Sequence, residues 1–467
     1  MQRVLWPALV LAVFGSPFVY LDPADKMVIQ ERDVRAHMEF LAGDALKGRG
    51  SGTEHEHIAA QYAAAQLRQF GLAPVGDAEA DGKKSFLQTI TLTKRAFAEA
   101  PRLNFSLNDK TTEWTHGKEI VLAQAAAAEL GGPLQKLVGS APVKPGSFVL
   151  LTAPANSDRQ ALNQSIGAIV EQKPAAVLVR VHPEWQQFWS RLAARLPQLP
   201  SDATGNGRNV IFLSAAAAQA LQQISDGTPM QLQGQAGVTE TSYTWNTVGV
   251  LPGSDPKLSQ EVIVLSAHLD HLGVGRPVSG DSIYNGADDD ASGVTTVLEL
   301  ARILGAGPKP RRTVYFALFG SEERGGHGSQ HFIKNPPAPL NQIIADLQFE
   351  MIGRPDAKVP VNTLWLTGYE RSNLGPELAT HGAALVADPH PEENFFQRSD
   401  NYAFAKLGVV AHTVSSYGLH QEYHQANDDL SHIDFAHMTH AINSMVKPVQ
   451  WLVNSNFVPA WVEGKKP

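Results

Sequence analysis

The sequence predicts a doubly wound α/β protein, with a mostly parallel mixed sheet, helices on both faces, and a smaller inserted α/β domain. Two observations lead to this fold class. Short apolar runs rich in branched residues alternate with helix-like stretches, once in the middle of the chain and again from Thr244 onward. Metal-type polar residues follow the later runs directly, as expected where sites form at the carboxyl ends of strands.

Two helices are predicted at the start of the folded chain. Apolar residues recur at helical spacing in residues 33–41 and again in residues 59–70, with a glycine-rich turn between them. Gly71 closes the second helix. A looser polar stretch is expected to run from there to about Arg102.

The middle of the chain predicts a small α/β unit of its own. We expect strands at residues 147–152, 175–181 and 209–213, separated by helices at residues 159–171 and 184–196. No convergent cluster of ligand-type residues occurs in this region. We therefore interpret it as an inserted lid or spacer domain.

From Thr244 onward the order of elements is that of a doubly wound sheet. Strands are predicted at residues 261–266, 312–319, 343–349, 363–367 and 409–414. Helices are predicted at residues 293–304 and 435–453.

The composition is that of an ordinary globular protein. Of 467 residues, 43% are hydrophobic and 18% are charged, which excludes a disordered or fibrous chain. Lysine plus arginine number 38 against 46 aspartate plus glutamate, the net charge is −8, and no basic block occurs, so no nucleic-acid partner is expected. Cysteine is absent, which leaves any metal to His, Asp and Glu.

The amino terminus carries one membrane-like segment. Residues 4–20 are uncharged, and Pro7, Gly15 and Pro17 interrupt them, which favours a signal peptide over a spanning helix. We expect residues 1–22 to be a signal peptide, the protein to be periplasmic or secreted, and the mature chain to lack an integral membrane span. A buried N-terminal segment or a misassigned start codon is the alternative.

Clusters of metal-type residues follow the predicted strands of the later region. They are His268 with Asp270, the acids Asp288 to Asp290, the pair Glu322 and Glu323, Glu350, and His424. Three adjacent carboxylates could compensate a helix dipole, but like charges held together raise one another's pKa, and a divalent ion relieves that cost.

Five of these residues make up the donor set of a dinuclear site. Two zinc ions that share one carboxylate need that bridge and two further N or O ligands each. His268, Asp289, Glu323, Glu350 and His424 supply such a set, each from a separate loop. The neighbouring glutamates can divide the work of a hydrolase, with one as ligand and one as general base for water.

The combination of His-x-Asp, Gly-Ala-Asp-Asp-Asp-Ala-Ser-Gly, Glu-Glu and a late Tyr-His resembles the co-catalytic zinc aminopeptidases, metallopeptidase family 28. This family includes bacterial leucyl aminopeptidases and glutamate carboxypeptidase II, and the resemblance spans about Asp33 to Val453. It implies a zinc exopeptidase fold of the phosphorylase/hydrolase type, two Zn²⁺ ions per chain and peptide substrates. Residues 23–105 and 240–467 would form the catalytic domain, and residues 106–239 resemble a protease-associated domain.

The resemblance also implies a role for each ligand. His268 and Glu350 would bind one zinc ion, Glu323 and His424 the other, and Asp289 would bridge the two. Asp289 is chosen over its neighbours because the family's bridging acid lies four residues before the Gly of the Ser-Gly pair.

Three further residues receive roles from the resemblance. Glu322 would be the general base that takes a proton from the water between the ions and later gives it to the leaving amine. Asp270 would orient His268, and Tyr423 is a candidate to polarise the scissile carbonyl and stabilise the oxyanion.

Two residues depart from the family pattern. Glu350 stands where the family more often has Asp, so Asp346 is the alternative ligand at this position. Asn401 stands where His is common and is expected to alter the substrate pocket. Outside the motifs, His55 and His57 are expected to face solvent, and His271 to pack or hydrogen-bond near the site.

Other functions remain open at this level. A single-zinc glutaminyl cyclase has a similar fold, and a carboxypeptidase would need a positively charged pocket for an acidic C-terminal residue. A non-catalytic, receptor-like relative would lack ligands or the base, and none is missing here. The sequence does not indicate the oligomeric state.

Overall fold

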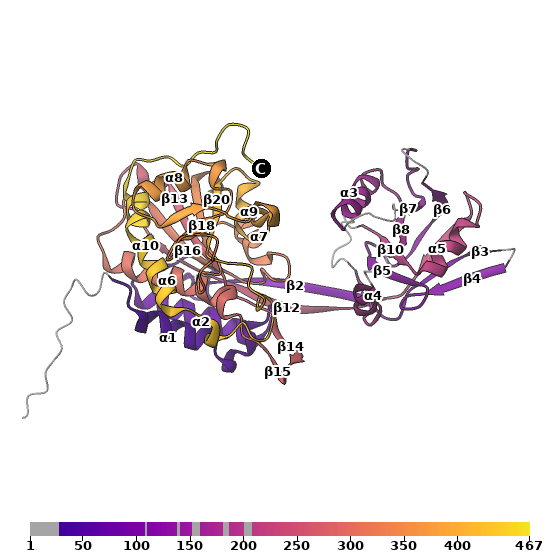
Figure 1. Ribbon diagram of the computed structural model, residues 1–467, viewed down its shortest axis with the longest axis horizontal. Coiled ribbons are helices and arrows are strands. Elements are labelled where there is room, and N and C mark those ends of the chain that lie inside the picture. Colours follow the sequence, from indigo (N-terminus) through magenta and orange to yellow (C-terminus); the bar gives the residue numbers. More distant parts are fainter. Residues whose placement is uncertain (1–27, 108–109, 138–140, 152–158, 181–185, 200–207) are drawn as a thin grey trace, which may run out of the picture. The chain divides into compact units, whose positions relative to one another are not determined.

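The computed structural model describes residues 28–107, 110–137, 141–151, 159–180, 186–199 and 208–467 (Figure 1). The expected signal peptide lies outside these residues, as do residues 152, 181, 184 and 185 of the predicted strands and helix. The chain divides into two compact units, one of Met1–Ile90 with Tyr243–Pro467 and one of Thr91–Ser242. We call them unit 1 and unit 2.

The mixed sheet of unit 1 has the strand order β19-β18-β20-β17-β13-β16-β12-β2, and β2 and β12 each include residues of unit 2. The strands are β2 (Leu87–Phe97), β12 (Ala236–Leu251), β13 (Val262–His268), β16 (Thr313–Phe319), β17 (Ile343–Phe349), β18 (Leu364–Leu366), β19 (Leu385–Ala387) and β20 (Val410–Ser415). The central strands β20, β17, β13 and β16 run parallel, while β12 and β18 are antiparallel to their neighbours. The four central strands therefore end at one edge of the sheet.

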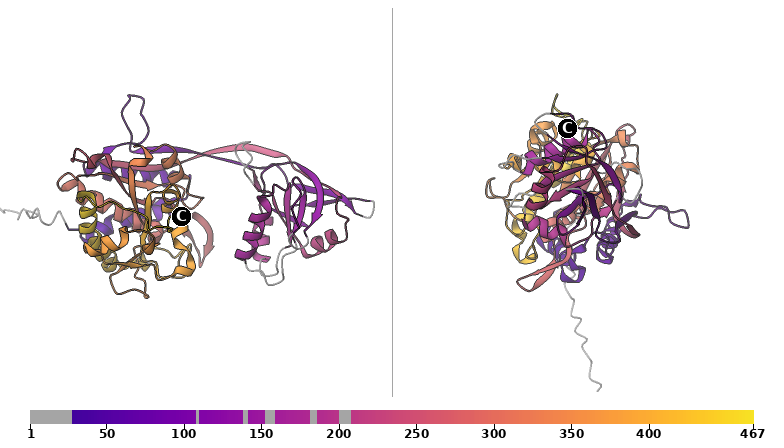
Figure 2. Two further views of the ribbon diagram at one scale, coloured as in Figure 1. Left: turned by 90° about the horizontal axis from the view of Figure 1, so that it is seen from above. Right: turned by 90° about the vertical axis from the view of Figure 1, so that its right-hand side faces the viewer.

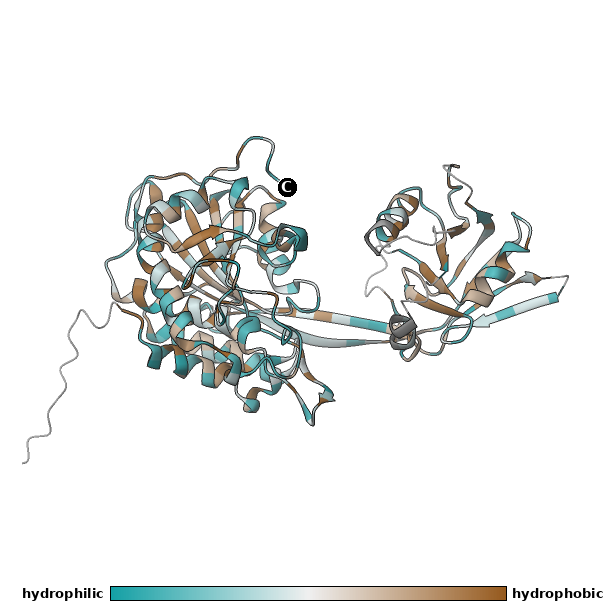
Figure 3. Cartoon of the chain, in the orientation of Figure 1, coloured by the Kyte–Doolittle hydropathy of each residue, from teal (hydrophilic) through white to brown (hydrophobic). Residues whose placement is uncertain are grey.

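Helices cover both faces of this sheet (Figures 1 and 2). One face packs against α1 (Glu31–Leu41), α2 (Glu54–Gln69), α6 (Gly293–Ala306), α8 (Leu374–Thr380) and α10 (Phe435–Asn454). The other packs against α7 (His327–Lys334) and α9 (Asn401–Ala405). Figure 3 shows hydrophobic central strands between helices whose outer sides are hydrophilic. The predicted doubly wound α/β fold is confirmed.

The predicted strands of unit 1 agree with the structure to within about two residues, but β2, β12 and β19 were not predicted. The 11 residues of β2 lie where a loose polar stretch was expected. Its exposed positions are all Thr or Lys, and only its first residues alternate between buried and exposed. Pairing with β12 in the sheet, rather than an apolar run, makes this segment a strand.

Unit 2 contains an eight-stranded mixed sheet with the order β4-β3-β11-β6-β7-β8-β10-β5. The neighbours β6 (Leu130–Lys136), β7 (Phe148–Leu151), β8 (Ala176–Arg180) and β10 (Val210–Leu213) are parallel, with helices α3 (Arg159–Val170), α4 (Gln186–Ala193) and α5 (Ala215–Gln222). The expected α/β elements are present. The strands β3 (Arg102–Leu107), β4 (Lys110–Thr115), β5 (Ile120–Gln124), β6 and β11 (Pro229–Gln233) were not predicted.

The predicted insert, residues 106–239, lies within unit 2, and its likeness to a protease-associated domain stays a prediction. Among the described residues, no helix is both long and apolar enough to cross a membrane.

His412 is a histidine buried in the sheet of unit 1, on β20. Its Nδ1 lies 2.7 Å from the carbonyl oxygen of Thr367 and its Nε2 lies 2.7 Å from Ser372 Oγ. Burial lowers the pKa of His412 to about 4, because the charged ring would lose its hydration. The ring is therefore neutral in the folded protein near pH 7.

This buried histidine predicts a loss of stability in mild acid. The unfolded chain takes up a proton near the ordinary histidine pKa of about 6.5, while the folded chain resists protonation until about pH 4, so stability falls as the pH drops through this window. The difference in unfolding free energy between the wild type and His412→Gln should shrink by about 2 kcal/mol from about pH 7 to about pH 5. Urea unfolding at both pH values measures it, and a constant difference would contradict the prediction.

Candidate metal centre

The ligand residues predicted from the sequence meet at the carboxyl edge of the central strands. His268 is the last residue of β13, Glu322 and Glu323 follow β16, and Glu350 follows β17. Since β13 is paired in parallel with β16, His268 lies beside Phe319, three residues before Glu322. His424 lies in the segment after β20, and Asp289 lies just before α6.

Two groups of ligand atoms form at this edge, and Asp289 belongs to both. His268, Asp289 and Glu350 make up the first group, and His271, Asp289 and Glu323 the second; the ligand atoms of each group lie within 4.8 Å of one another. In the first group, His268 Nε2 is 3.0 Å from Asp289 Oδ1.

His424 contacts the second group from its exposed side. Its Nε2 is 3.2 Å from Asp289 Oδ2 and 3.2 Å from Glu323 Oε1, and its side chain is 36% exposed. The structure thus brings all five predicted ligands together.

The donor atoms fit metal ions better than hydrogen bonds to one another. His268 Nε2 and Glu323 Oε1 are buried and make no hydrogen bond, although Asp289 Oδ1 lies 3.0 Å from the first and His271 Nδ1 lies 2.9 Å from the second. Two ligands of one zinc ion, each 2.0–2.2 Å from it at a tetrahedral angle, lie about 3.3 Å apart. Such spacing, with imidazole and carboxylate donors, suits Zn²⁺ and similar transition metals.

The three consecutive acids before α6 have different partners. The carboxylate of Asp290 accepts hydrogen bonds of 3.0–3.2 Å from backbone amides at the end of β13, the start of α6 and the loop after β17. Asp288 accepts the amide of Gly353 (2.7 Å) and contacts His420 Nε2 (2.9 Å). Of the three, only Asp289 contacts the rings of His268 and His424.

Asp428, which the sequence analysis did not single out, holds this acidic segment in place. Its two carboxylate oxygens accept the backbone amides of Asp288 (3.0 Å) and Asp289 (3.1 Å). Burial raises the pKa of Asp428, and the nearby carboxyl of Asp288 raises it further. Its place four residues after His424 was the only sequence signal.

Asp270 contacts His268 differently from the expected carboxylate–imidazole pair. His268 Nδ1 is 3.1 Å from the backbone oxygen of Asp270 and 4.0 Å from its carboxylate. The Asp270 carboxylate instead accepts the amide of Glu322 (2.9 Å) and the hydroxyl of Ser51. Asp270 therefore links the His268 strand end to the Glu-Glu loop.

Glu56 on α2 holds the same loop. Its Oε1 accepts the amide of Ser321 (3.2 Å) and the hydroxyl of Thr244 (2.5 Å), and its Oε2 accepts the amide of Gly52 (2.6 Å). The Thr53-x-x-Glu56 spacing of a helix capping box was the available signal, and Thr53 does accept the amide of Glu56.

The neighbouring histidines His55 and His57 are half-buried rather than facing solvent as expected. His57 stacks on Trp245 with ring centres 4.2 Å apart.

Glu350 is held by two side chains. Its Oε2 accepts hydrogen bonds from Gln348 Nε2 (3.1 Å) and Ser399 Oγ. Burial raises its pKa to about 7. The alternative ligand Asp346 lies within β17, accepts a hydrogen bond from Ser266 Oγ (2.7 Å), and belongs to neither ligand group.

Asn401 also acts through this network. Asn401 was expected to alter the substrate pocket, but its side chain is buried. Its backbone N–H donates to Gln348 Oε1 (2.6 Å), and its side-chain oxygen accepts a hydrogen bond from the Thr413 hydroxyl. Asn401 thus orients the glutamine that contacts Glu350.

Glu322 lies among the charges of the site. Burial raises its pKa well above the usual range, and the nearby carboxyls of Asp400, Glu350 and Glu323 raise it further. Cations bound at the two ligand groups would lower this pKa.

A pocket opens beside Glu350. Its walls include the rings of Trp365, Phe395, Tyr417 and Tyr423, and Arg398. Tyr423 stacks on His424 with ring centres 3.9 Å apart. Burial and the carboxylates of the site raise the pKa of Tyr423, so its hydroxyl stays protonated and can donate a hydrogen bond.

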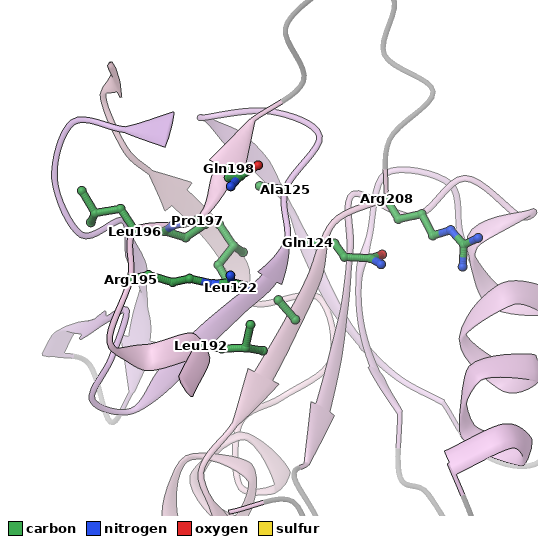
Figure 4. Close-up of a pocket in the computed structure, with 10 residues that line it drawn as sticks. Leu122, Gln124, Ala125, Leu192, Arg195, Leu196, Pro197, Gln198 and Arg208 are labelled. Carbon is green, nitrogen blue, oxygen red and sulfur yellow. The ribbon is translucent and has the colours of Figure 1, made fainter. Parts of the chain in front are cut away.

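A larger pocket, of about 500 Å³, lies within unit 2 (Figure 4). None of its ten lining residues is His, Asp or Glu. The side chains of its two arginines, Arg195 and Arg208, lie at opposite sides of the pocket and do not converge on one point. This pocket therefore lacks the donors of a metal site.

A doubly wound sheet with two His/carboxylate groups sharing one aspartate at its strand ends defines a class of metal-dependent hydrolases. Residues 246–448 match the sequence profile of Peptidase family M28. This match covers less than half of the chain, and it includes every residue of the two ligand groups.

Individual relatives agree with this family. The chain is 26% identical over 246 residues to the "Probable lipoprotein aminopeptidase LpqL" of Mycobacterium tuberculosis, covering 45% of this chain and 47% of that protein. It is 28% identical over 225 residues to "Leupeptin-inactivating enzyme 1" of Streptomyces exfoliatus, covering 47% of each. The chain spans about half the length of these curated relatives.

Solved structures with a similar fold include an aminopeptidase. An aminopeptidase from Aneurinibacillus sp. strain AM-1 has a TM-score of 0.54 and 16% identity, covering 93% of this chain and 96% of that one.

Metal addition should stabilise unit 1 because it neutralises buried, like-charged groups. The metal-stripped protein should unfold at a lower temperature, and each tenfold rise of free Zn²⁺ above its dissociation constant should add about 1.4 kcal/mol per ion. Differential scanning calorimetry with increasing Zn²⁺ measures this shift. Mg²⁺, which prefers oxygen-only octahedral sites, serves as the control and should have little effect. Unfolding that is indifferent to zinc would contradict a metal centre here.

Proposed function

We propose that the protein is a dinuclear zinc exopeptidase that removes N-terminal amino acids from peptides. The observation that carries the proposal is the shared position of Asp289 between two ligand groups. A carboxylate in that place can hold two ions a few ångströms apart, which is the arrangement of two-metal aminopeptidases. The match of residues 246–448 to Peptidase family M28 and the aminopeptidase relatives support the same reaction class.

His268, Asp289, Glu350, Glu323 and His424 would hold the ions. Zinc bound there supplies Lewis acidity toward the scissile carbonyl and lowers the pKa of the attacking water. The free α-amine of an N-terminal residue would meet a site rich in carboxylates, which favours a cationic group over a C-terminal carboxylate.

Glu322 is the proposed general base. Its backbone is fixed by the hydrogen bond from its amide to Asp270, and Ser321 before it is held by Glu56. Its carboxyl is close enough to His268, Glu323 and Glu350 for their charges to shift its pKa, so it lies near both ligand groups. In this role Glu322 takes a proton from the attacking water and delivers it to the leaving amine.

Tyr423 and the pocket beside Glu350 would bind the rest of the substrate. The protonated hydroxyl of Tyr423 can donate to the carbonyl oxygen as negative charge develops on it. The aromatic walls formed by Trp365, Phe395 and Tyr417 favour an apolar side chain on the residue that is removed.

One observation favours a carboxypeptidase as the second candidate. Arg398 lines the pocket and could bind a substrate carboxylate. However, its guanidinium donates to Glu393 Oε2 (3.2 Å) and lies over the ring of Phe395. Arg398 is therefore already paired with a carboxylate of the same chain. We therefore rank the aminopeptidase first. A single-zinc cyclase is less consistent with two ligand groups.

Export of the protein remains part of the proposal. The relative from Mycobacterium tuberculosis is named as a lipoprotein, which is consistent with a protein that acts outside the cytoplasm.

The proposal is tested with zinc-loaded wild-type protein and two matched sets of short peptides. We expect release of the first residue from peptides with a free amine and a blocked carboxyl end, best with apolar first residues, and loss of turnover with a chelator. Mass spectrometry of the products identifies the bond that is cleaved. Cleavage only of amine-blocked peptides with free carboxyl ends would establish the carboxypeptidase, and conversion of N-terminal glutamine to a cyclic product the cyclase.

The base assignment makes a separate prediction. Glu322→Gln keeps the shape of the side chain but removes the proton acceptor, so kcat should fall by about 10²–10⁴-fold while zinc content and folding are retained. Steady-state kinetics and metal analysis of the same preparation measure both. The exposed Glu370→Gln is the control and should match the wild type. Near-normal turnover of Glu322→Gln would rule out this base.

A further inference from the structure

His271 lies in the metal centre without an assigned role. It follows Asp270 after β13, and its side chain is completely buried. Both of its ring nitrogens are buried and make no hydrogen bond. Burying an imidazole nitrogen without a partner costs about 1–3 kcal/mol, so a fully buried ring of this kind calls for a partner of another type.

The Nδ1 atom of His271 is directed at the second ligand group. It is 2.9 Å from Glu323 Oε1 and 3.8 Å from Asp289 Oδ2. The contact with Glu323 is short, yet neither atom makes a hydrogen bond, so the two are not aligned for proton donation. The two distances lie on either side of the separation of about 3.3 Å that is expected for two ligands of one zinc ion.

The surrounding backbone fixes the orientation of the His271 ring. Gly286 adopts φ 61°, and a Cβ atom there would lie 2.4 Å from Cγ of the ring, so the backbone contacts the ring face directly. The buried guanidinium of Arg49 donates to the carbonyl oxygens of Gly286 (2.9 Å) and Leu269 (3.0 Å), which anchors the segments on both sides. His271 is therefore held in place before any ligand binds, whereas His424 is partly exposed.

We propose that His271 binds, through Nδ1, the metal ion held by Asp289 and Glu323, in addition to the five predicted ligands. This inference rests on the proposed dinuclear function and deepens it. The second ion then has one more protein ligand than the first, which has His268, Asp289 and Glu350. Since an ion with fewer protein ligands keeps open positions for water and substrate, the two ions differ in affinity and the first is the more accessible.

Zinc binding by matched variants tests this assignment. Isothermal titration of the metal-stripped protein should resolve two binding steps. Loss of a side chain that hydrogen-bonds a metal ligand lowers metal affinity by about 10–100-fold. His271→Ala removes a ligand itself, so the zinc affinity of one binding step should fall by at least about 100-fold, while the affinity of the other step stays within a few fold. His420→Ala is the control, because His420 also contacts a buried acid, Asp288, but belongs to neither group. Unchanged binding by His271→Ala would overturn the proposal.

A second measurement on the wild type does not depend on a variant that folds. In the Co²⁺-substituted protein, each ligand imidazole contributes one exchangeable N–H proton whose NMR signal is shifted far from the normal range. We expect three such signals, from His268, His271 and His424. Two bound ions with only two signals would refute the role of His271 alone, whereas failure to bind any metal would refute the proposed function itself.

Discussion

The concentration of buried negative charge at one edge of the sheet is the constraint on which the rest of unit 1 depends. Asp289, Glu323 and Glu350 lie side by side there, with Asp270, Asp290 and Glu322 close behind them. Carboxylates removed from water in this way raise one another's pKa unless cations or hydrogen-bond donors offset the repulsion. The rings of His268 and His424 lie beside these carboxylates, and metal ions bound there would offset the repulsion further.

Backbone amides neutralise the acids that do not face the ligand groups. Asp290 receives three amides from separate segments, and Asp428 receives two from the acidic run itself. Arg49 is a buried cation with the complementary role: its guanidinium donates hydrogen bonds to four backbone carbonyl oxygens around the same loops. Charged side chains thus position the chain segments, so that Asp289 alone of its run contacts His268 and His424.

The same arrangement links structure to the proposed chemistry. Glu322 and Glu323 are neighbours in sequence but differ in surroundings, because Glu323 contacts the histidines while Glu322 has no such partner. A carboxyl without a fixed partner can take and release protons, whereas one between two histidines is suited to binding a metal. The extra histidine at the second group makes the two metal positions unequal, which separates a more firmly held ion from a more accessible one.

The sequence by itself determined the alternation of strands and helices and the identity of the five candidate ligands. Apolar runs such as residues 343–349 are local signals that predict strands. In a parallel sheet the residues that follow such strands lie at one edge, independently of the conformation of the connecting loops. The sequence could not reveal β2, whose strand character depends on its neighbour in the sheet.

Only the tertiary structure decided which groups face one another. The choice of Asp289 among three adjacent acids first came from a resemblance, and its geometry became visible only through the partners of Asp288 and Asp290. Glu56 and Asp428 reach the site from segments far away in the chain. The sequence predicted that His271 packs near the site, and only the structure shows that its ring lies beside Glu323. Periodicity along a chain reports which side of an element is buried, but the distance between two side chains depends on how every intervening element packs.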